Sequence, residues 1–186
     1  MFNITIMKSK ENKLLELFFN SSKHLHFEEL RTKVHIGKPQ LARWLHLFQK
    51  QSLIKRVKNA GKMPYYIQDS GNPHYQHKKK LYTLEKMTNS GLFFHLSTLA
   101  DVKVAILFGS FARADWYSES DIDLFIYGNA DKLEQGKFEL KLKRTIQIHE
   151  AHNTQDLQKI DKLLPYILSG MFIKGSIQDL GVQIHA

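Results

Sequence analysis

The chain has 186 residues, of which 42% are hydrophobic and 11% are aromatic, a composition typical of folded proteins and not of disordered ones. Its length allows one sizeable hydrophobic core or two small ones. The absence of cysteine excludes disulfides and thiolate metal sites. No stretch approaches the roughly eighteen consecutive apolar residues of a membrane span, and no secretory signal is recognisable, so we expect a cytoplasmic protein without a membrane partner.

The formal net charge of +9 is unevenly distributed along the chain. Residues 1–90 hold 17 Lys and Arg against 6 Asp and Glu, whereas residues 91–186 hold 10 against 12. The basic excess therefore lies in the first half. This asymmetry suggests two modules with different partners, of which the first faces polyanions. A basic surface that only keeps the protein in solution is the alternative.

The first half predicts three helices followed by a hairpin. Apolar residues recur at helical spacing in three segments: 10–20, 27–34 and 39–51. Pro39 suits the first turn of the third helix, which presents one apolar face made of Leu41, Trp44, Leu45 and Phe48. Two β-prone segments flank a turn signal at 59–62 and predict the hairpin: 53–57 and 64–67.

This order of elements is that of the winged helix-turn-helix family. The segment LARWLHLFQKQSLIKRVKNAGKMPYYI resembles the recognition helix and wing of that family, and the resemblance covers about residues 10–68. It implies that the third helix enters the major groove of duplex DNA while the wing contacts the DNA backbone or minor groove. The implied groove-facing residues are Lys38, Gln40, Arg43 and His46. The implied phosphate contacts on the hairpin are Lys55, Arg56, Lys58 and Lys62. A winged helix that docks on a protein, or that forms a homodimer, is also consistent with the pattern.

A linker and a helix are predicted between the two halves. Residues 69–73 have the composition of a linker, and residues 72–92 predict a bridging helix that Gly91 is placed to end. We therefore expect a first domain over residues 1–70, a helical bridge over 71–92 and a second domain over 93–186.

The second half begins with a strand, a short helix and a second strand. Val102 to Phe108 is a nearly continuous apolar run that predicts a buried strand, and Asp121 to Tyr127 predicts the next one. Asp121 and Asp123 are two residues apart, so a strand points both carboxylates to one face. Mg²⁺ is the natural cation to neutralise them, because it prefers oxygen ligands and is usually shared with substrate phosphates. Gly109 allows the backbone to approach those phosphates closely, and the amide and hydroxyl of Ser110 are able to donate to them.

The segment LFGSFARADWYSESDIDLFIYG resembles the nucleotidyltransferases of the DNA polymerase β superfamily, especially the minimal nucleotidyltransferase group. The matching residues are Gly109, Ser110, Ala112, Arg113, Ser120, Asp121 and Asp123. The resemblance implies an α+β fold for the whole chain, with a small mixed sheet in the second domain that carries helices on one side. It also implies binding of a nucleoside triphosphate, ATP above all, with Mg²⁺ held by Asp121 and Asp123. Arg113 either contacts a phosphate or pairs with Asp115 or Glu119.

One position departs from that pattern. Active transferases of this family generally carry a third carboxylate on a later strand, where it helps to hold the second metal and accepts a proton from the attacking hydroxyl. Residues 132–142 predict a helix and residues 144–149 the strand in question, and Gln147 stands where the carboxylate is expected. An amide oxygen is able to ligate Mg²⁺ but is not a general base. His149 shares the face of Gln147 and is either a substitute base or ligand or an ordinary polar strand residue.

The tail predicts a helix over residues 155–168 and short strands over 171–174 and 181–184. The whole chain resembles archaeal proteins that join a winged helix to a minimal nucleotidyltransferase domain. Three functions follow from this resemblance. In the first, the protein would be an enzyme that transfers a nucleotide to a hydroxyl acceptor, as antitoxins of this group do when they nucleotidylate a partner toxin. Alternatively, it is a DNA-binding transcriptional regulator whose degenerate catalytic domain senses a nucleotide, or an adaptor without chemistry.

Overall fold

The structure is a computed structural model that describes residues 10–181. The chain divides between Lys79 and Lys80 into two compact units, which we call unit 1 (up to Lys79) and unit 2 (from Lys80). The boundary lies within helix α4 (Pro73–Ser90), the helix expected over residues 72–92. Gly91 ends it with φ of 85°, a left-handed conformation that costs glycine little. In the described part of the chain, no helix is long and apolar enough to span a membrane.

Unit 1 contains the three helices and the hairpin that the sequence predicts. Each of these elements lies within one residue of its predicted bounds: α1 (Lys10–Phe19), α2 (Phe27–Val34), α3 (Lys38–Lys50), β2 (Ile54–Val57) and β3 (Tyr65–Gln68). A further strand, β1 (Leu25–His26), pairs with β3 and was not predicted. It has only two residues, too few to show an alternating pattern. The hairpin is therefore part of an antiparallel sheet in the order β1-β3-β2.

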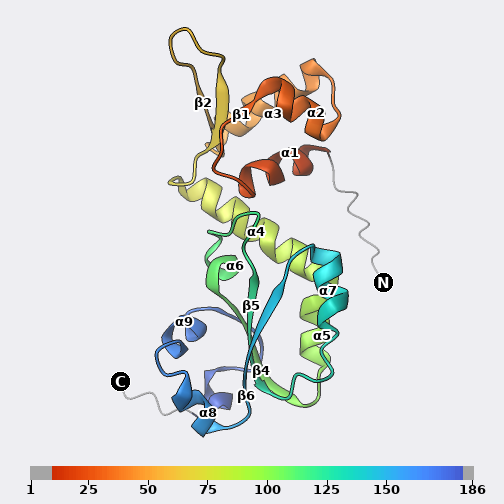
Figure 1. Cartoon of the computed structure of the whole chain (residues 1–186), viewed down its shortest axis with the longest axis vertical. Coiled ribbons are helices and arrows are strands. Elements are labelled where there is room, and N and C mark those ends of the chain that lie inside the picture. The colour runs from red at the N-terminus through yellow and green to blue at the C-terminus, as the bar shows by residue number, and fades with distance from the viewer. Residues whose placement is uncertain (1–9, 182–186) are drawn as a thin grey trace. The chain divides into compact units, whose positions relative to one another are not determined.

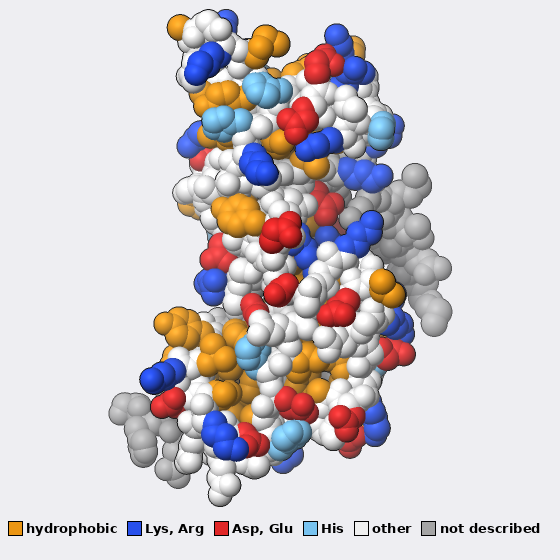
Figure 2. All heavy atoms as spheres, viewed as in Figure 1, with side chains coloured by type: hydrophobic (Ala, Val, Ile, Leu, Met, Phe, Trp, Pro, Cys, Tyr) orange, Lys and Arg blue, Asp and Glu red, His pale blue; other side chains and the backbone are white. Residues whose placement is uncertain are grey.

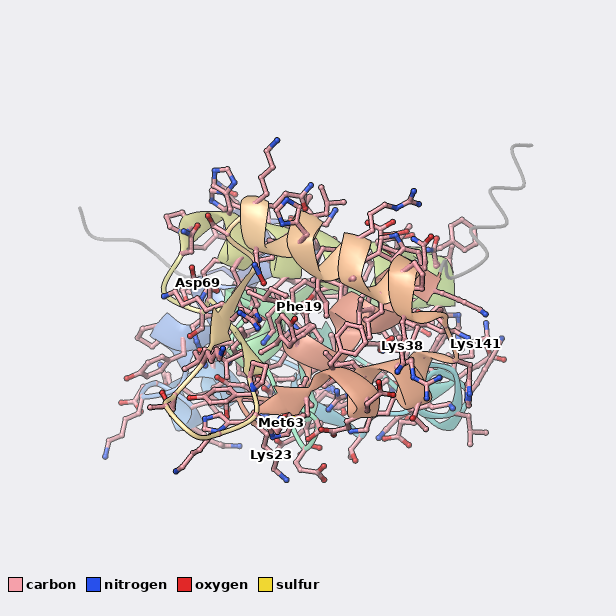
Figure 3. The ribbon with its side chains drawn as sticks, turned by 90° about the horizontal axis from the view of Figure 1, so that it is seen from above. Phe19, Lys23, Lys38, Met63, Asp69 and Lys141 are labelled. Carbon is pink, nitrogen blue, oxygen red and sulfur yellow. The ribbon has the colours of Figure 1, made fainter. Side chains whose placement is uncertain are left out.

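The core of unit 1 forms where α1 and α3 turn their apolar faces inward. Phe19 is fully buried, and its ring packs edge-on against Tyr75 with 5.4 Å between the ring centroids. In Figure 3, Phe19 lies among the packed side chains, whereas Lys23 and Met63 project outward. Of the four apolar residues predicted for one face of α3, Trp44 is only half-buried; the fully buried ones are Leu41, Leu45 and Phe48. The face that Figure 2 shows carries Lys and Arg side chains over unit 1.

Unit 2 is built on a mixed sheet of four strands in the order β6-β5-β4-β7. Their bounds confirm four of the predicted strands: β4 (Val102–Phe108), β5 (Ile122–Gly128), β6 (Ile146–Ala151) and β7 (Met171–Lys174). β5 and β6 are parallel, whereas β4 pairs antiparallel with both β5 and β7. Together with unit 1, this sheet confirms the α+β fold class.

Helices cover both faces of this sheet, not one face as the resemblance implied. A buried cluster on one face includes Phe125 and Tyr127 of β5 and Ile167 of helix α9 (Leu164–Leu168). Two further short helices contribute to the same cluster: α8 (Thr154–Lys159) and the 3₁₀ helix η1 (Ile177–Leu180). Two helices lie on the other side in Figure 1: α5 (Leu92–Thr98), which was not predicted, and α7 (Gln135–Leu142).

Three predicted segments need correction. The helix expected over 155–168 is two helices, α8 and α9 (Leu164–Leu168), because Pro165 has no N–H to donate and is tolerated only in the first turn of a helix. The helix expected from Lys132 begins at Gln135, because residues 130–133 form a turn in which the N–H of Leu133 donates to the Ala130 carbonyl. Of the strand expected over 181–184, only Gly181 lies within the described residues, and it ends η1.

Candidate functional site

The Gly-Ser motif lies at the end of β4, where helix α6 (Gly109–Arg113) begins. Gly109 has φ of +68°, and a Cβ added there would lie 2.1 Å from Oδ2 of Asp123. Both the conformation and the missing side chain are therefore required at this position. The carboxylate of Asp123 lies directly against the backbone of Gly109, so two motif elements that are fourteen residues apart in the sequence form one corner.

Three strands bring the candidate residues into one row. Asp123 of β5 pairs with Phe108 of β4 on one side and with Gln147 of β6 on the other. Gln147 therefore lies on the predicted strand, and the register of the sheet places it next to Asp123. Asp121 was expected inside the strand, but β5 begins at Ile122, so Asp121 lies just before it. Asp123 is half-buried, whereas Asp121 is exposed.

The surroundings of Asp123 disfavour its charge. Burial raises the pKa of the Asp123 carboxyl, the charge of His149 lowers it, the charge of Asp121 raises it, and the charge of Arg113 lowers it. The net direction is upward. A carboxylate that is partly withdrawn from water beside a second carboxylate gains from a nearby cation.

Arg113 forms the ion pair that the sequence offered as an alternative to phosphate contact. Its Nε donates to Oδ2 of Asp115 at 2.9 Å, and its Nη2 lies 3.4 Å from Oδ1 of the same residue. Both side chains are exposed, and exposed ion pairs contribute only about 0–1 kcal/mol. This pair therefore presents only a small energetic barrier to an incoming phosphate.

His149 lies on the same face of β6 as Gln147 and packs against Phe108, the last residue of β4. Its ring meets the ring of Phe108 edge-on, with 5.2 Å between the centroids. Phe108 is the residue before Gly109, so the imidazole borders the same corner as Asp123.

The family comparison agrees with this geometry. Residues 95–177 match the family described as Polymerase beta, Nucleotidyltransferase. This part of the chain is a polymerase β nucleotidyltransferase domain. The match includes Gly109, Asp121, Asp123 and Gln147, and it does not extend to unit 1. No curated protein matches the chain. Nucleotidyltransferases of this family generally use Mg²⁺ and nucleoside triphosphates.

Mg²⁺ fits the side chains that the nucleotidyltransferase domain presents at the corner. Within residues 10–181, no group of three or more His, Asp or Glu converges as a metal site. The corner offers the carboxylates of Asp121 and Asp123 and, on the neighbouring strand, the amide oxygen of Gln147. Proteins commonly hold Mg²⁺ through one or two carboxylates together with waters and substrate phosphates, so two carboxylates suffice when a nucleotide completes the site.

Sequence reasoning missed Arg144, which holds the loop before Asp121 in the nucleotidyltransferase domain. Nη1 of Arg144 donates to the carbonyl oxygens of Tyr117 at 2.6 Å and Ser120 at 3.3 Å, and also to that of Ser118. Its guanidinium carbon lies 5.5 Å from the ring centroid of Trp116. Arg144 follows this loop by more than twenty residues, so no local pattern reveals the contact.

Ser120 of the motif is engaged in the same loop. Its Oγ accepts a hydrogen bond from the N–H of Tyr117 at 2.9 Å, and its own N–H donates to the Tyr117 carbonyl at 3.2 Å. The hydroxyl therefore closes the turn that precedes Asp121. The preceding Trp116 is almost fully buried, and its Nε1 donates to Oγ1 of Thr83 at 2.7 Å.

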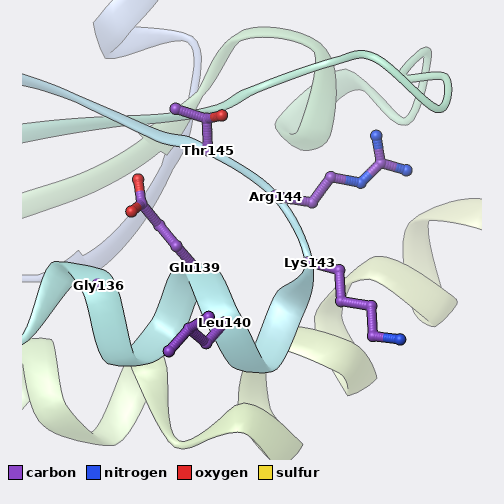
Figure 4. A pocket seen from close by; sticks show the side chains of 6 residues that line it. All are labelled: Gly136, Glu139, Leu140, Lys143, Arg144 and Thr145. Carbon is purple, nitrogen blue, oxygen red and sulfur yellow. The ribbon is translucent and has the colours of Figure 1, made fainter.

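A pocket at the turn between α7 and β6 lies beside this anchor. Figure 4 shows its lining, in which Glu139 points toward the strand while Lys143 and Arg144 point away from it. Oε1 of Glu139 accepts hydrogen bonds from the N–H of Ile146 at 2.9 Å and from Nε2 of Gln135 at 3.1 Å. These contacts fix the start of β6 and hence the position of Gln147. None of the predicted nucleotide or metal contacts lines the pocket.

In unit 1, the candidate DNA contacts of α3 lie on its solvent side. Lys38, Arg43 and His46 are exposed, and Gln40 is half-buried. Nζ of Lys38 lies 3.3 Å from Oε1 of Glu28, and Nη2 of Arg43 donates to Oε1 of Gln40 at 3.2 Å.

The four candidate residues of β2 and the β2–β3 connection are all exposed: Lys55, Arg56, Lys58 and Lys62. Nζ of Lys55 lies 2.7 Å from Oδ1 of Asp69. A basic surface of this kind meets the electrostatic requirement for a polyanion.

Proposed function

We propose that this protein binds a nucleoside triphosphate with Mg²⁺ and transfers the nucleotidyl group to a hydroxyl acceptor. The observation that carries the proposal is the corner in which the Asp123 carboxylate lies against Gly109 and beside Gln147. When bound, Mg²⁺ neutralises charge on the phosphates and thereby favours displacement at phosphorus. ATP is the preferred nucleotide in this proposal.

Each residue of the corner has a role in binding. Asp121 and Asp123 hold the metal, which removes the repulsion between the two carboxylates. Gly109 admits a phosphate close to the backbone, and the Ser110 hydroxyl donates to it. Arg113 leaves its exposed pair with Asp115 and contacts a phosphate oxygen with its fork of N–H groups.

The transfer requires a base for the proton of the acceptor hydroxyl, and Gln147 does not provide one. The acceptor oxygen forms a bond to the α-phosphorus, the bond from that phosphorus to the bridging oxygen breaks, and pyrophosphate leaves. The proton of the acceptor hydroxyl must go to a base. Gln147 is an amide and does not accept it, which leaves the imidazole of His149 or solvent water as the acceptor, so the transfer is slow.

The neutral Gln147 beside Asp123 also favours a second function, in which nucleotide binding is retained without efficient transfer. Within residues 10–181 the two carboxylates have no third acidic partner, and such a pair is suited to binding Mg²⁺ and phosphate, as a sensor requires. Unit 1 would then supply the output. In this reading the protein is a transcriptional regulator, or an antitoxin-like protein that binds a partner toxin, with a nucleotide as its signal.

For either function, we propose that unit 1 binds duplex DNA as a winged helix. The solvent side of α3, with Lys38, Gln40, Arg43 and His46, would enter the major groove. The exposed lysines and arginine of β2 and its connection to β3 would contact phosphates. Each phosphate contact releases counterions, so the affinity falls steeply as salt increases. A homodimer would double this surface.

Calorimetric titration with Mg²⁺-ATP tests the nucleotide site. The wild-type protein should bind, and Asp121→Asn should bind more weakly, because Asp121 is exposed and its replacement removes charge without disturbing the core. Equal binding by the two proteins would remove the corner from consideration as the site. Transfer of label from the α-phosphate of ATP, GTP, CTP or UTP to a co-expressed protein or RNA then separates the enzyme from the sensor.

Gel-shift titration with duplex DNA tests unit 1 in the full chain. Joint replacement of Lys38 and Arg43 by Ala should weaken binding and reduce its dependence on salt. Binding of duplexes that does not vary with salt would contradict the proposal. A shift that Mg²⁺-ATP changes would support the sensor.

A further inference from the structure

The sheet of unit 1 has one face that packs on the helices and one face that is open to solvent. On the packed face, Leu25 of β1 pairs with Tyr66 of β3, and both side chains are buried. On the other face, Tyr65 pairs with His26 of β1 and with Val57 of β2, so these three side chains form a row. We call this second face the outer face of the sheet.

Aromatic rings stack on the outer face. The ring of His24 lies parallel to that of Tyr65, with 3.9 Å between the centroids and 16° between the planes. The ring of His26 meets Tyr65 from the side at 6.3 Å, and its Nδ1 lies 3.1 Å from the carbonyl oxygen of Pro64. His24 and His26 are exposed, and Tyr65 is half-buried. His24 is thus the exposed end of a short stack whose second ring is held by the sheet.

Exposed basic side chains stand close in sequence to the residues of the outer face. Lys23 precedes His24 and is exposed, as are Lys58, Lys62 and Met63 in the connection between β2 and β3; Met63 has 77% of its surface accessible. Lys23 and Met63 lie at the lower edge of Figure 3, which looks down on the molecule from above. This edge is the side that faces the viewer in Figure 2. On that face, histidine side chains lie beside hydrophobic ones, with Lys and Arg side chains around them (Figure 2).

Such a surface suits one kind of ligand. Flat rings that are exposed and pre-oriented provide stacking partners, and the lysines attract negative charge. A single-stranded nucleic acid supplies both complements, because its unpaired bases expose their π-faces and its backbone carries a phosphate for each base. Bases within a duplex are already stacked on each other and do not meet this requirement.

We propose that the outer face of the sheet binds single-stranded nucleic acid. A base stacks on the free side of the His24 ring and extends the stack of His24 and Tyr65, while Lys23, Lys58 and Lys62 neutralise the adjacent phosphates. The site shares Lys58 and Lys62 with the surface proposed for duplex DNA, but its aromatic rings lie outside α3. It goes beyond the proposed nucleotide function because it involves no residue of unit 2. Stacking tolerates any base, so the site has little sequence preference.

Fluorescence anisotropy with labelled twelve-nucleotide strands tests the proposal in the full-length protein. The probes are oligo-dT, oligo-rU and an abasic strand of the same length, which keeps the phosphates but has no bases. The oligo-dT strand should bind at least about fivefold more tightly than the abasic strand. His24→Ala should weaken oligo-dT binding by about the same factor and leave the abasic strand unaffected.

Two further variants make the test specific. His77→Ala replaces an exposed histidine of α4 in unit 1 and should leave every affinity unchanged. Tyr65→Phe keeps the ring and should bind as the wild type does, whereas Tyr65→Leu should lose the stacking contribution, with circular dichroism confirming that both variants fold. Tighter binding of oligo-rU assigns the face to RNA, and tighter binding of oligo-dT assigns it to a DNA strand. Equal affinity for the oligo-dT and abasic strands, or wild-type affinity of His24→Ala, would overturn the proposal.

Discussion

Asp123 on β5 and Gln147 on β6 are direct neighbours in the parallel ladder, and Gln147 offers an amide where a carboxylate would add a third negative charge. The register that makes them neighbours is supported at both ends of the pairing, from Ile122 with Ile146 to Tyr127 with Ala151. The residue at position 147 therefore lies next to Asp123 in the sheet.

Gln147→Asp should increase the rate of nucleotidyl transfer. The new carboxylate stands beside Asp123 and provides a carboxylate base for the acceptor hydroxyl, an effect worth about 10²-fold or more. Transfer of α-phosphate label at saturating Mg²⁺-ATP measures it. Gln147→Asn is the matched control, since it has the size of Asp without its charge, and it should not accelerate transfer. If the two variants react at the same rate, proton acceptance does not limit the reaction.

Gly109→Ala should remove nucleotide binding and destabilise the protein. The left-handed backbone alone costs a residue with a side chain about 1–2 kcal/mol, and the added carbon would displace the carboxylate of Asp123. Gly136→Ala is the control, because its Cβ in α7 meets no atom within 4 Å and alanine is favoured in a helix. Thermal melting should show a lower Tm for Gly109→Ala than for Gly136→Ala, and titration should show binding of Mg²⁺-ATP only by Gly136→Ala. Normal binding by Gly109→Ala would show that the corner is not used.

Asp123→Asn should be more stable than the wild type near neutral pH when metal is absent. The folded state raises the pKa of Asp123 above its ordinary value of 3.8, so it holds the proton more tightly than the unfolded chain does. The stability contributed by this group is present below pH 3.8 and is lost as the pH rises through the raised pKa. Urea unfolding in EDTA at several pH values measures the difference between the two proteins, which should disappear in acid. Added Mg²⁺-ATP should stabilise only the wild type. If Asp123→Asn is less stable than the wild type at neutral pH, the folded state does not disfavour the charge of Asp123.

Arg144→Lys should weaken Mg²⁺-ATP binding although it keeps the positive charge. A lysine cannot reproduce the planar group that donates to the loop carbonyls while it lies over the Trp116 ring. The loop before Asp121 then loses its anchor, and limited proteolysis should cleave it faster. Lys143→Gln, at the adjacent position in the same turn, is the control and should change neither measurement. Unchanged affinity of Arg144→Lys would mean that the loop holds its position without this contact.

Much of the corner was predictable because its features are local. A strand that ends at Phe108, a glycine that follows it, and two aspartates in alternate positions are all encoded within about twenty residues. The positions of α1, α2 and α3 were predictable for the same reason, since each repeats its apolar residues at helical spacing. Errors occurred where a competing local feature decided the outcome, as when Pro165 divided the expected helix in two.

The sequence by itself determined the residue types of the candidate site, the strand-turn-strand unit that holds most of them and the neutral side chain at Gln147. Only the tertiary structure decided that Gln147 lies beside Asp123, that Arg144 reaches back to the loop before Asp121, and that β1 completes the sheet of unit 1. The physical reason is that strand register and long-range hydrogen bonds are selected by the packing of whole faces. That selection sums contributions from residues far apart in the chain, and no local pattern contains it.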